Sequence, residues 1–166
     1  MAYAIRPFRN EDARALARLT IDAIRAIGAR RYSAQQVEAW AARPMRADRF
    51  IERADSGALI FVAADHADDP IAYALLEEDP SHQGHLDMLY CAPAHTRLGI
   101  ADELLAHAEH QARTRGIERL FTEASELARP AFERAGYKTL HRRDFTIEHG
   151  GSEVPIHNYA MEKRLT

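Results

Sequence analysis

The spacing of apolar residues near the start of the chain predicts a short strand followed by a helix. The strand-like run covers residues 3–8, and Asn10 then stands where a helix cap is expected. The positions that follow share one helical face: Leu16, Thr20, Ala23, Ile24 and Ile27. Gly28 is a natural end for this helix, because glycine readily closes helices in the left-handed conformation.

A second helix is predicted by a capping sequence. Ser33 and Gln36 have the S-x-x-Q spacing, in which each side chain bonds the backbone N–H of the other residue. The Arg-Pro pair at residues 43–44 ends this pattern, since the residue before a proline avoids helical geometry. A shorter helix is expected over residues 48–54, closing at Gly57.

The middle of the chain changes to strand-like runs. Residues 58–65 and 71–79 are separated by a segment ending in Asp-Asp-Pro, which favours a tight reversal, so the two runs predict a β-hairpin. A third run covers residues 85–92 and is followed by a proline. An apolar stripe then predicts a helix over residues 100–115, capped by Gly116.

The last part of the chain continues the mixture of strands and helices. A strand is expected at residues 119–125, a helix at 126–136, and two further strands hinged at Gly150 and Gly151. The order is β-α-α-α-β-β-β-α-β-α-β-β. This order predicts an α/β fold with a mixed, mostly antiparallel sheet and helices on both faces, and we expect residues 1–166 to form a single domain.

Composition narrows the class of protein. With 22 basic and 25 acidic residues the net charge is −3, which argues against nucleic acid or an anionic membrane as partner and favours a cationic acceptor over a polyanion. The basic runs at residues 30–31 and 141–144 are expected to be solvated surface. One cysteine, Cys91, excludes an intrachain disulfide, and the nine histidines lack the spacing of a metal site. No run approaches about 18 apolar residues and no signal-peptide core is present, so we expect a cytoplasmic protein.

Gly99 is the main clue to function, because it stands where the helix at residues 100–115 begins. Unpaired backbone N–H groups and a partial positive charge gather at such a terminus. Gly99 has no Cβ to obstruct a bulky anion, and Ala101 is nearly as bare, so the segment predicts a cradle for a diphosphate. The alternative is that Gly99 only allows the helix to pack closely on the sheet.

The segments "LDMLYCAPAHTRLGIADELL" and "ARPAFERAGY", with the order of elements, resemble the GCN5-related N-acetyltransferases, the GNAT superfamily, over essentially the whole chain. The resemblance implies acetyl-CoA as cosubstrate, with its pyrophosphate bound by main-chain amides of a Q/R-x-x-G-x-G/A signature. The slots of that signature fall on Thr96, Arg97, Leu98, Gly99, Ile100 and Ala101. Thr96 departs from the usual Gln or Arg. Asp102 and Glu103 follow and are expected to face outward, away from bound phosphate.

The resemblance also implies that the strand at residues 87–92 splays from the strand at 121–125. The pantetheine arm would then pair with main-chain groups of Met88, Leu89 and Tyr90. Ser125 is expected to hydrogen-bond the same arm. No metal is implied.

Candidates for the proton transfers are few. Asp87 aligns with the position where histone-acetylating relatives carry a glutamate base, and partial desolvation in its strand would raise its pKa. Its alternative role is that of a solvent-facing or paired strand residue. Glu123 on the neighbouring strand is the second candidate, and His85, on the same face as Asp87, shares the role or is a polar edge residue.

The usual acid is missing from the sequence. Family members often carry a tyrosine where this chain has Phe132, which has no proton to give but is still expected among the cofactor-binding residues. Tyr137 falls at an apolar slot. Either coenzyme A leaves as a stabilised thiolate or another hydroxyl acts, with Ser125, Tyr90 and Tyr159 as the candidates. A nucleophilic Cys91 is disfavoured because no neighbouring base is identifiable, so direct transfer is preferred.

The acceptor is the least defined part of this interpretation. Tyr32, Trp40, His85 and Tyr159 are candidates for binding it, and a small primary amine or an amino-acid-like metabolite is favoured over a protein lysine or N-terminus. A non-catalytic CoA-binding module is the alternative function. A nucleotide-binding enzyme is the weakest alternative, because the required glycine-rich loops do not occur in the sequence. A homodimer formed through the final strands is an expectation by analogy.

Overall fold

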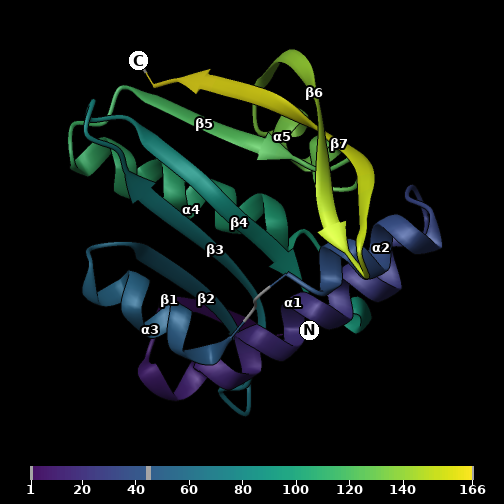
Figure 1. Ribbon diagram of the computed structural model, residues 1–166. Coiled ribbons are helices and arrows are strands. Elements are labelled where there is room, and N and C mark those ends of the chain that lie inside the picture. The colour runs from purple at the N-terminus through teal and green to yellow at the C-terminus, as the bar shows by residue number, and fades with distance from the viewer. Residues whose placement is uncertain (1, 44–45, 166) are drawn as a thin grey trace.

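The computed structural model describes residues 2–43 and 46–165, and seven strands among them form one sheet (Figure 1). The strands are β1 (Tyr3–Pro7), β2 (Leu59–Asp65), β3 (Pro70–Glu78), β4 (Gly84–Cys91), β5 (Arg119–Ala124), β6 (Lys138–His149) and β7 (Ser152–Arg164). Their spatial order is β1-β2-β3-β4-β5-β7-β6. Every neighbouring pair is antiparallel except β4 and β5.

Five α-helices connect these strands in the described part of the chain. They are α1 (Ala13–Gly28), α2 (Ala34–Ala41), α3 (Ala47–Asp55), α4 (Ile100–Thr114) and α5 (Arg129–Arg134). Short 3-10 turns, η1 (Asn10–Asp12) and η2 (Pro93–His95), precede α1 and α4. No helix in residues 2–43 or 46–165 is long and apolar enough to cross a membrane.

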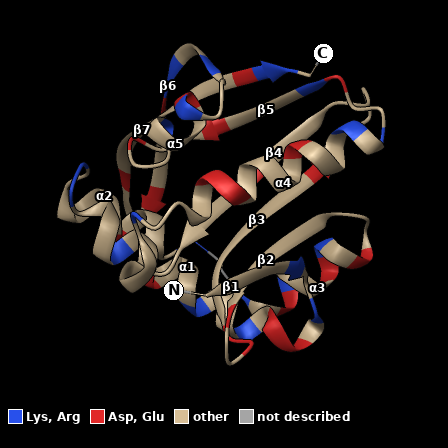
Figure 2. Cartoon of the chain, turned by 180° about the vertical axis from the view of Figure 1, so that it is seen from behind, with Lys and Arg blue, Asp and Glu red and all other residues tan. Residues whose placement is uncertain are grey.

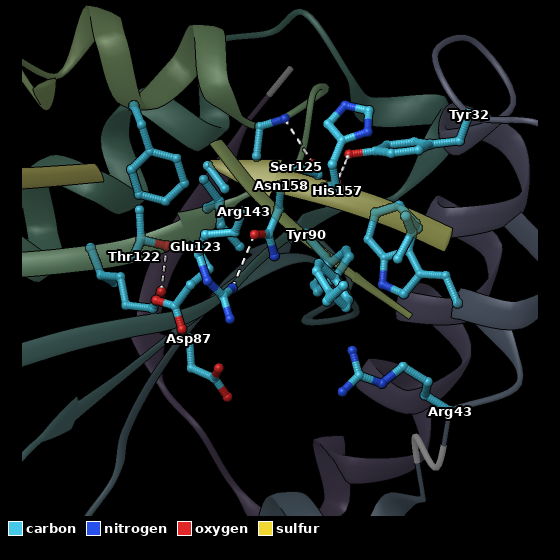
Figure 3. A pocket seen from close by; sticks show the side chains of 18 of the residues that line it. Tyr32, Arg43, Asp87, Tyr90, Thr122, Glu123, Ser125, Arg143, His157 and Asn158 are labelled. Carbon is cyan, nitrogen blue, oxygen red and sulfur yellow. Dashed lines mark hydrogen bonds between the residues drawn. The ribbon is translucent and has the colours of Figure 1, made fainter. Parts of the chain in front are cut away.

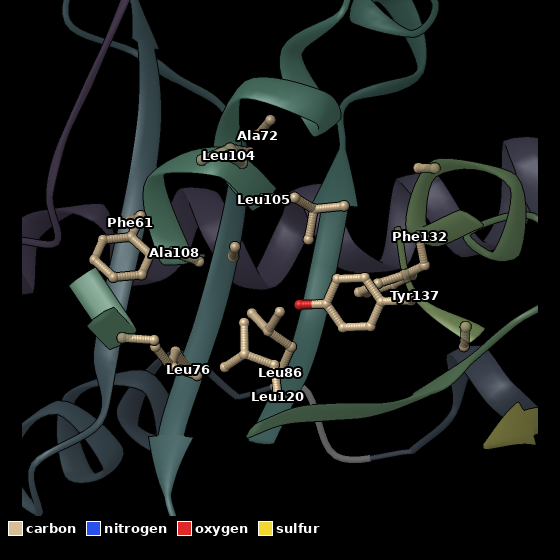
Figure 4. Close-up of a cluster of buried hydrophobic side chains, with 14 of the residues drawn as sticks. Phe61, Ala72, Leu76, Leu86, Leu104, Leu105, Ala108, Leu120, Phe132 and Tyr137 are labelled. Carbon is tan, nitrogen blue, oxygen red and sulfur yellow. The ribbon is translucent and has the colours of Figure 1, made fainter. Parts of the chain in front are cut away.

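The helices cover both faces of the sheet, because successive strand residues point to opposite sides. Val62 and Tyr73 face α1 and α3, whereas Phe61 and Leu76 face α4. Figure 1 shows α1 and α3 over one face, and Figure 2 shows α4 lying across the other face. Figure 4 shows the α4 side of the core, where Leu105 packs toward strand residues. The expected fold class is therefore confirmed.

Local signals predicted several element boundaries correctly. The Ser33 capping box is present, because Ser33 Oγ accepts the Gln36 N–H at 3.1 Å and Gln36 Oε1 accepts the Ser33 N–H at 2.8 Å. The hairpin of β2 and β3 and the hinge at residues 150–151 are also as expected. The helix α2 ends at Ala41, two residues before the expected Arg43, while Pro44 lies outside the described residues.

Two predicted helix boundaries are wrong. Asn10 does not cap α1; the chain first makes η1, in which Asp12 Oδ2 accepts the Arg9 N–H at 2.8 Å. The helix expected at residues 126–136 is shorter, because a turn precedes it. Ser125 Oγ accepts the Ala128 N–H at 3.1 Å in that turn, and α5 begins only afterwards.

The parallel contact between β4 and β5 is confined to one end of both strands. Only Gly84 with Leu120 and His85 with Phe121 are paired. Thr122 Oγ1 donates to the carbonyl of Leu86 at 2.7 Å, and beyond this bond the two strands diverge. We call this divergence the fork. Gly84 sits at its closed end, where an added Cβ would lie 2.5 Å from a methyl carbon of Leu120.

We expect Gly84→Ala to destabilise the protein by about 1–3 kcal/mol, because the added methyl group overlaps the strand contact that holds the fork together. The measurement is the free energy of unfolding in urea. Gly28→Ala is the matched control: its Cβ would make ordinary contacts of 3.4 Å or more at the end of α1. Equal stability of the two variants would show that close approach at the fork does not require glycine.

Candidate active site

Two cavities meet at the fork. The first, of about 610 Å³, lies at the beginning of α4 and is called the α4 cavity; His95, Arg97 and Gly99 line it. The second, of about 360 Å³, lies between β5 and the β6–β7 hairpin and is called the hairpin cavity; Asp87 and Glu123 line it. Both are lined by the same five residues at the fork: Trp40, Leu89, Tyr90, Ser125 and Ala128. Ligands entering from the two sides would therefore meet there.

Gly99 has the geometry of an anion cradle. Its φ of 78° and ψ of 5° lie in the left-handed region, which disfavours other residues. An added Cβ would contact no atom within 4 Å, so close packing on the sheet does not explain this glycine. The first helical bond of α4 runs from the Glu103 N–H to the Gly99 carbonyl at 3.1 Å, and the preceding N–H groups have no acceptor within the helix.

Most of the other residues expected at the phosphate signature line the α4 cavity. Thr96, Arg97, Ile100 and Ala101 do so, whereas Leu98 lies outside the lining and is 51% exposed. The Thr96 hydroxyl is occupied locally, because it donates to the Pro93 carbonyl at 3.3 Å. This segment therefore offers the cavity mainly backbone groups.

The two acidic residues after the signature are both exposed. Asp102 nevertheless reaches the lining of the α4 cavity, which differs from the outward orientation expected for it. Arg134 donates to Asp102 Oδ1 at 3.1 Å and offsets its charge. Repulsion of a phosphate by this carboxylate is therefore reduced.

The strand β4 contributes to both cavities through some of its residues. Leu89 and Tyr90 line both, whereas Met88 lies outside both linings and packs in the core beside the hydroxyl of Tyr73, 3.6 Å from the Met88 sulfur. The register with β3 shifts at Asp87, because Leu86 and Met88 face consecutive residues of β3. Asp87 is thus the extra residue of a β-bulge, a feature that often redirects side chains beside active sites.

The two carboxylates of the hairpin cavity have different partners. Asp87 Oδ2 lies 2.6 Å from Arg53 Nη1, and the same arginine binds Glu77. Glu123 Oε2 lies 3.0 Å from Nε2 of His85. Neither Arg53 nor His85 lines the cavity, so each carboxylate is held from behind.

The His85 ring stacks on Phe121 with centroids 4.6 Å apart. Burial acts to lower the pKa of His85, but the hydrogen bond to Glu123 and the nearby carboxylate charges outweigh burial. The pKa is therefore raised above its usual 6.5. His85 is a partner of the cavity's carboxylate rather than a lining residue.

Tyr90 places a phenol at the fork. Burial and the charge of Asp87 raise its pKa to about 12, against the hydrogen bond to the Trp40 indole. The phenol is therefore protonated at neutral pH and is a weaker acid than free tyrosine. Phe132, at the usual place of the acid, lines the hairpin cavity at 2% exposure and packs edge-on against the buried Tyr137.

Cys91 does not have the properties of a nucleophile. Its sulfur lies 3.1 Å from the His95 carbonyl, and burial raises the pKa of the thiol to about 11. The thiolate is scarce at neutral pH under these conditions.

Residues 2–43 and 46–165 contain no cluster of three or more side chains able to hold a metal ion.

The expected acceptor residues are only partly brought together. Tyr32 and Trp40 line the hairpin cavity, with ring centroids 5.6 Å apart. The Tyr32 hydroxyl is committed, because it donates to the His157 carbonyl and accepts the Glu126 N–H. Tyr159 lies outside both cavity linings, and its hydroxyl donates to Glu126 Oε1 at 2.5 Å.

Two arginines of the hairpin cavity were not predicted from the sequence. Arg43 and Arg143 both line it (Figure 3), although Arg143 belongs to a basic run that was expected to be solvated surface. Strand alternation was the available signal. Arg143, Phe145 and Ile147 occupy every second position of β6 and therefore share one face, which is the face that lines the cavity.

Comparisons with known proteins agree on one family. A family model described as an acetyltransferase (GNAT) domain matches residues 28–157. The uncharacterized N-acetyltransferase YafP of Escherichia coli (strain K12) is 29% identical over 136 residues, which cover 82% of this chain and 81% of the relative.

Solved structures extend the likeness over nearly the whole chain. A protein described as a GCN5-related N-acetyltransferase, "Aminotransferase, Class-II", from Rhodopseudomonas palustris superposes with a TM-score of 0.83 at 31% identity, covering 99% of this chain and 97% of the other. The PaiA N-acetyltransferase of Thermoplasma acidophilum, solved with coenzyme A, has a TM-score of 0.78 at 21% identity, with coverages of 99% and 100%. The sequence motifs, the fold and the family match together show that this chain belongs to the GNAT family of acetyltransferases.

Proposed function

We propose that this protein transfers an acetyl group from acetyl-CoA to the primary amine of a small acceptor by direct attack. The observation that carries the proposal is the meeting of the two cavities at the fork, where Tyr90 lines both. A thioester held in the α4 cavity and an amine held in the hairpin cavity would be brought together beside Glu123. Such positioning is a major source of rate acceleration in two-substrate reactions.

The α4 cavity has the features that coenzyme A requires. Gly99 and the first turn of α4 offer bare N–H groups to the diphosphate, and Arg30 and Arg97 add positive charge to the lining. The edge of β4 at Leu89 and Tyr90 offers main-chain groups to the amide-bearing arm, and Ser125 can donate its hydroxyl hydrogen. When bound, acetyl-CoA supplies the activated acetyl thioester. The PaiA relative's complex with coenzyme A supports this assignment.

Glu123 is the base in this proposal and Asp87 is not. The partner of Glu123 is a histidine, whose ring can take up a proton and carry it onward. The partner of Asp87 is Arg53, which does not release a proton. Asp87 therefore contributes negative charge beside the amine while Glu123 takes its proton.

The proton balance uses both Glu123 and Tyr90. Glu123 accepts one proton from the incoming ammonium, so that a neutral nitrogen attacks the acetyl carbon. Tyr90 donates a proton to the sulfur as the carbon–sulfur bond breaks. The second proton that nitrogen loses on forming the carbon–nitrogen bond restores the Tyr90 hydroxyl. The products are the acetamide and the thiol of coenzyme A, with one proton released from Glu123.

Gly99→Glu tests the cradle. The new carboxylate would stand in the α4 cavity beside the phosphates, so we expect acetyl-CoA affinity to fall about 100-fold or more. Isothermal titration calorimetry measures this affinity.

Gly116→Glu is the matched control for Gly99→Glu. Gly116 also has a left-handed φ, of 74°, and it lies just after the other end of α4. It therefore carries the same backbone strain away from the cavity and should retain full affinity. Unchanged affinity in Gly99→Glu would remove the cradle assignment.

Glu123→Gln tests the base. The amide cannot accept the proton, so we expect kcat to fall about 100-fold or more. The exposed Glu153, at the start of β7, provides the control Glu153→Gln, which should leave kcat unchanged. Thiol release measured with acetyl-CoA and a reactive amine is the readout. Full activity in Glu123→Gln combined with loss of activity in Asp87→Asn would reverse the roles of the two carboxylates.

The same assay separates an enzyme from a non-catalytic CoA-binding module. Tight binding of acetyl-CoA without thiol release against amines, polyamines, amino acids and aminoglycosides would establish the binding module and overturn the proposed transfer. Release with any of these amines supports the enzyme.

The His85–Glu123 pair predicts a pH-dependent contribution to stability. Because the pKa of His85 is raised in the folded protein, the pair stabilises the fold below the unfolded value of 6.5, and this contribution is lost as pH rises through the raised pKa. Relative to His85→Gln, we expect wild type to gain about 1 kcal/mol or less near pH 6 and nothing near about pH 9. Urea unfolding at the two pH values measures this difference. A gap that stays constant or widens toward high pH would contradict the pairing.

A further inference from the structure

The hairpin cavity is lined by both acidic and basic side chains. Asp87 and Glu123 project from β4 and β5 at the fork, whereas Arg143 projects from β6 and Arg43 follows α2. Figure 3 shows Arg143 on the same side of the cavity as the two carboxylates and Arg43 on the other side. One arginine is therefore placed near the proposed base.

The two carboxylates of this cavity have partners outside its lining. Arg53 and His85 bind them at 2.6 Å and 3.0 Å. Within residues 2–43 and 46–165, no carboxylate oxygen lies within 4.0 Å of the guanidinium of Arg43 or Arg143. Arg143 can therefore receive an anion without giving up an existing ion pair.

Arg143 is set in place for such a contact. Its Nη1 donates to Asn158 Oδ1 at 3.0 Å across the β6–β7 hairpin, and its guanidinium carbon lies 5.6 Å from the centre of the Phe145 ring. The side chain is half-buried. An oriented, partly desolvated guanidinium is well suited to bind a carboxylate through charge-assisted hydrogen bonds.

The positions of Arg143 and Glu123 in the sheet set how far apart they begin. On β7, Asn158 pairs with Arg143 and Ala160 pairs with Glu123. Their backbones are therefore about 7 Å apart along the strand direction and about 10 Å apart across the sheet, because β7 lies between β6 and β5. The long Arg143 side chain shortens this separation, and Figure 3 shows it on the same side of the cavity as Glu123.

A third part of the cavity wall is apolar. Phe145 and Ile147 continue the Arg143 face of β6, and Ile156 and Trp40 stand on neighbouring elements. This wall offers a place for a hydrophobic side chain, because its burial there removes apolar surface from water.

We propose that the acceptor is an α-amino acid with an apolar side chain, a substrate class that rests on the proposed acetyl transfer. Its ammonium lies at Glu123, its carboxylate binds Arg143, and its side chain packs against Trp40, Phe145 and Ile147. Transfer forms the bond between the α-nitrogen and the acetyl carbon and releases coenzyme A as its thiol, with the protons moving as above.

Matched acceptors test this inference directly. Thiol release is measured with leucine and phenylalanine, with leucinamide and phenylalaninamide, which lack the negative charge, and with the decarboxylated amines 3-methylbutylamine and 2-phenylethylamine. We expect kcat/KM for the amino acids to exceed that for their uncharged counterparts by about 10-fold to 100-fold, as expected for an oriented charge pair. Aspartate and glutamate are expected to be poor acceptors, because their second carboxylate would face the apolar wall.

A neighbouring pair of arginines supplies the variants. Arg143→Gln should lower kcat/KM for the amino acids about tenfold or more and leave the decarboxylated amines unchanged. Arg142→Gln is the control, because Arg142 is exposed and already paired with Asp144. Arg143→Lys should restore part of the loss, since it keeps the charge but not the forked geometry. Thermal unfolding of each variant shows that it is folded.

The outcomes are distinct. Equal kcat/KM for amino acids and decarboxylated amines in the wild type, or an equal loss for both in Arg143→Gln, overturns the amino-acid assignment while the acetyltransferase stands. If a polyamine or an aminoglycoside supports thiol release and none of these compounds does, the amino-acid assignment is likewise overturned while the acetyltransferase stands. Thiol release with no amine at all defeats the proposed function itself.

Discussion

The early divergence of β4 from β5 is the constraint on which the site depends. Parallel pairing ends after two residue pairs, and the Thr122 hydroxyl takes the next carbonyl of β4, at Leu86. The bulge at Asp87 then turns the strand. Main-chain groups on this edge of β4 are left without a strand partner, and buried backbone groups need partners. A fork of this kind favours an extended, amide-bearing ligand, and it is also where the two cavities meet.

The acceptor side of the fork is held in place by contacts between distant segments. The Tyr32 hydroxyl donates to the His157 carbonyl on β7 and accepts the Glu126 N–H after β5. One side chain thereby fixes the segment before α2 against both walls of the hairpin cavity (Figure 3). The value of Tyr32 to the site is thus the shape that it imposes, since its hydroxyl has no further hydrogen to offer a substrate.

Local features were predictable from the sequence, and long-range partners were not. The Ser33 capping box and the glycine at residue 99 follow from neighbouring residues and backbone geometry, so a single sequence carries the signal. The environment of Asp87 does not follow from neighbouring residues. Desolvation was expected to dominate there, but Arg53, from a helix far away in the sequence, binds the carboxylate. Tyr159 was expected at the acceptor, yet Glu126 holds its hydroxyl outside the cavity linings. Such pairings arise from the fold, and residue spacing does not encode them.

The same distinction applies to electrostatics. A net charge of −3 favours a cationic acceptor when the chain is treated as a whole. That field is screened within about 8–10 Å at physiological ionic strength, so at the fork only nearby groups act strongly. There the carboxylates already have partners, whereas Arg43 and Arg143 have no carboxylate within 4.0 Å in the described chain. The α-amino acid proposed as acceptor would meet both kinds of group, its ammonium at Glu123 and its carboxylate at Arg143.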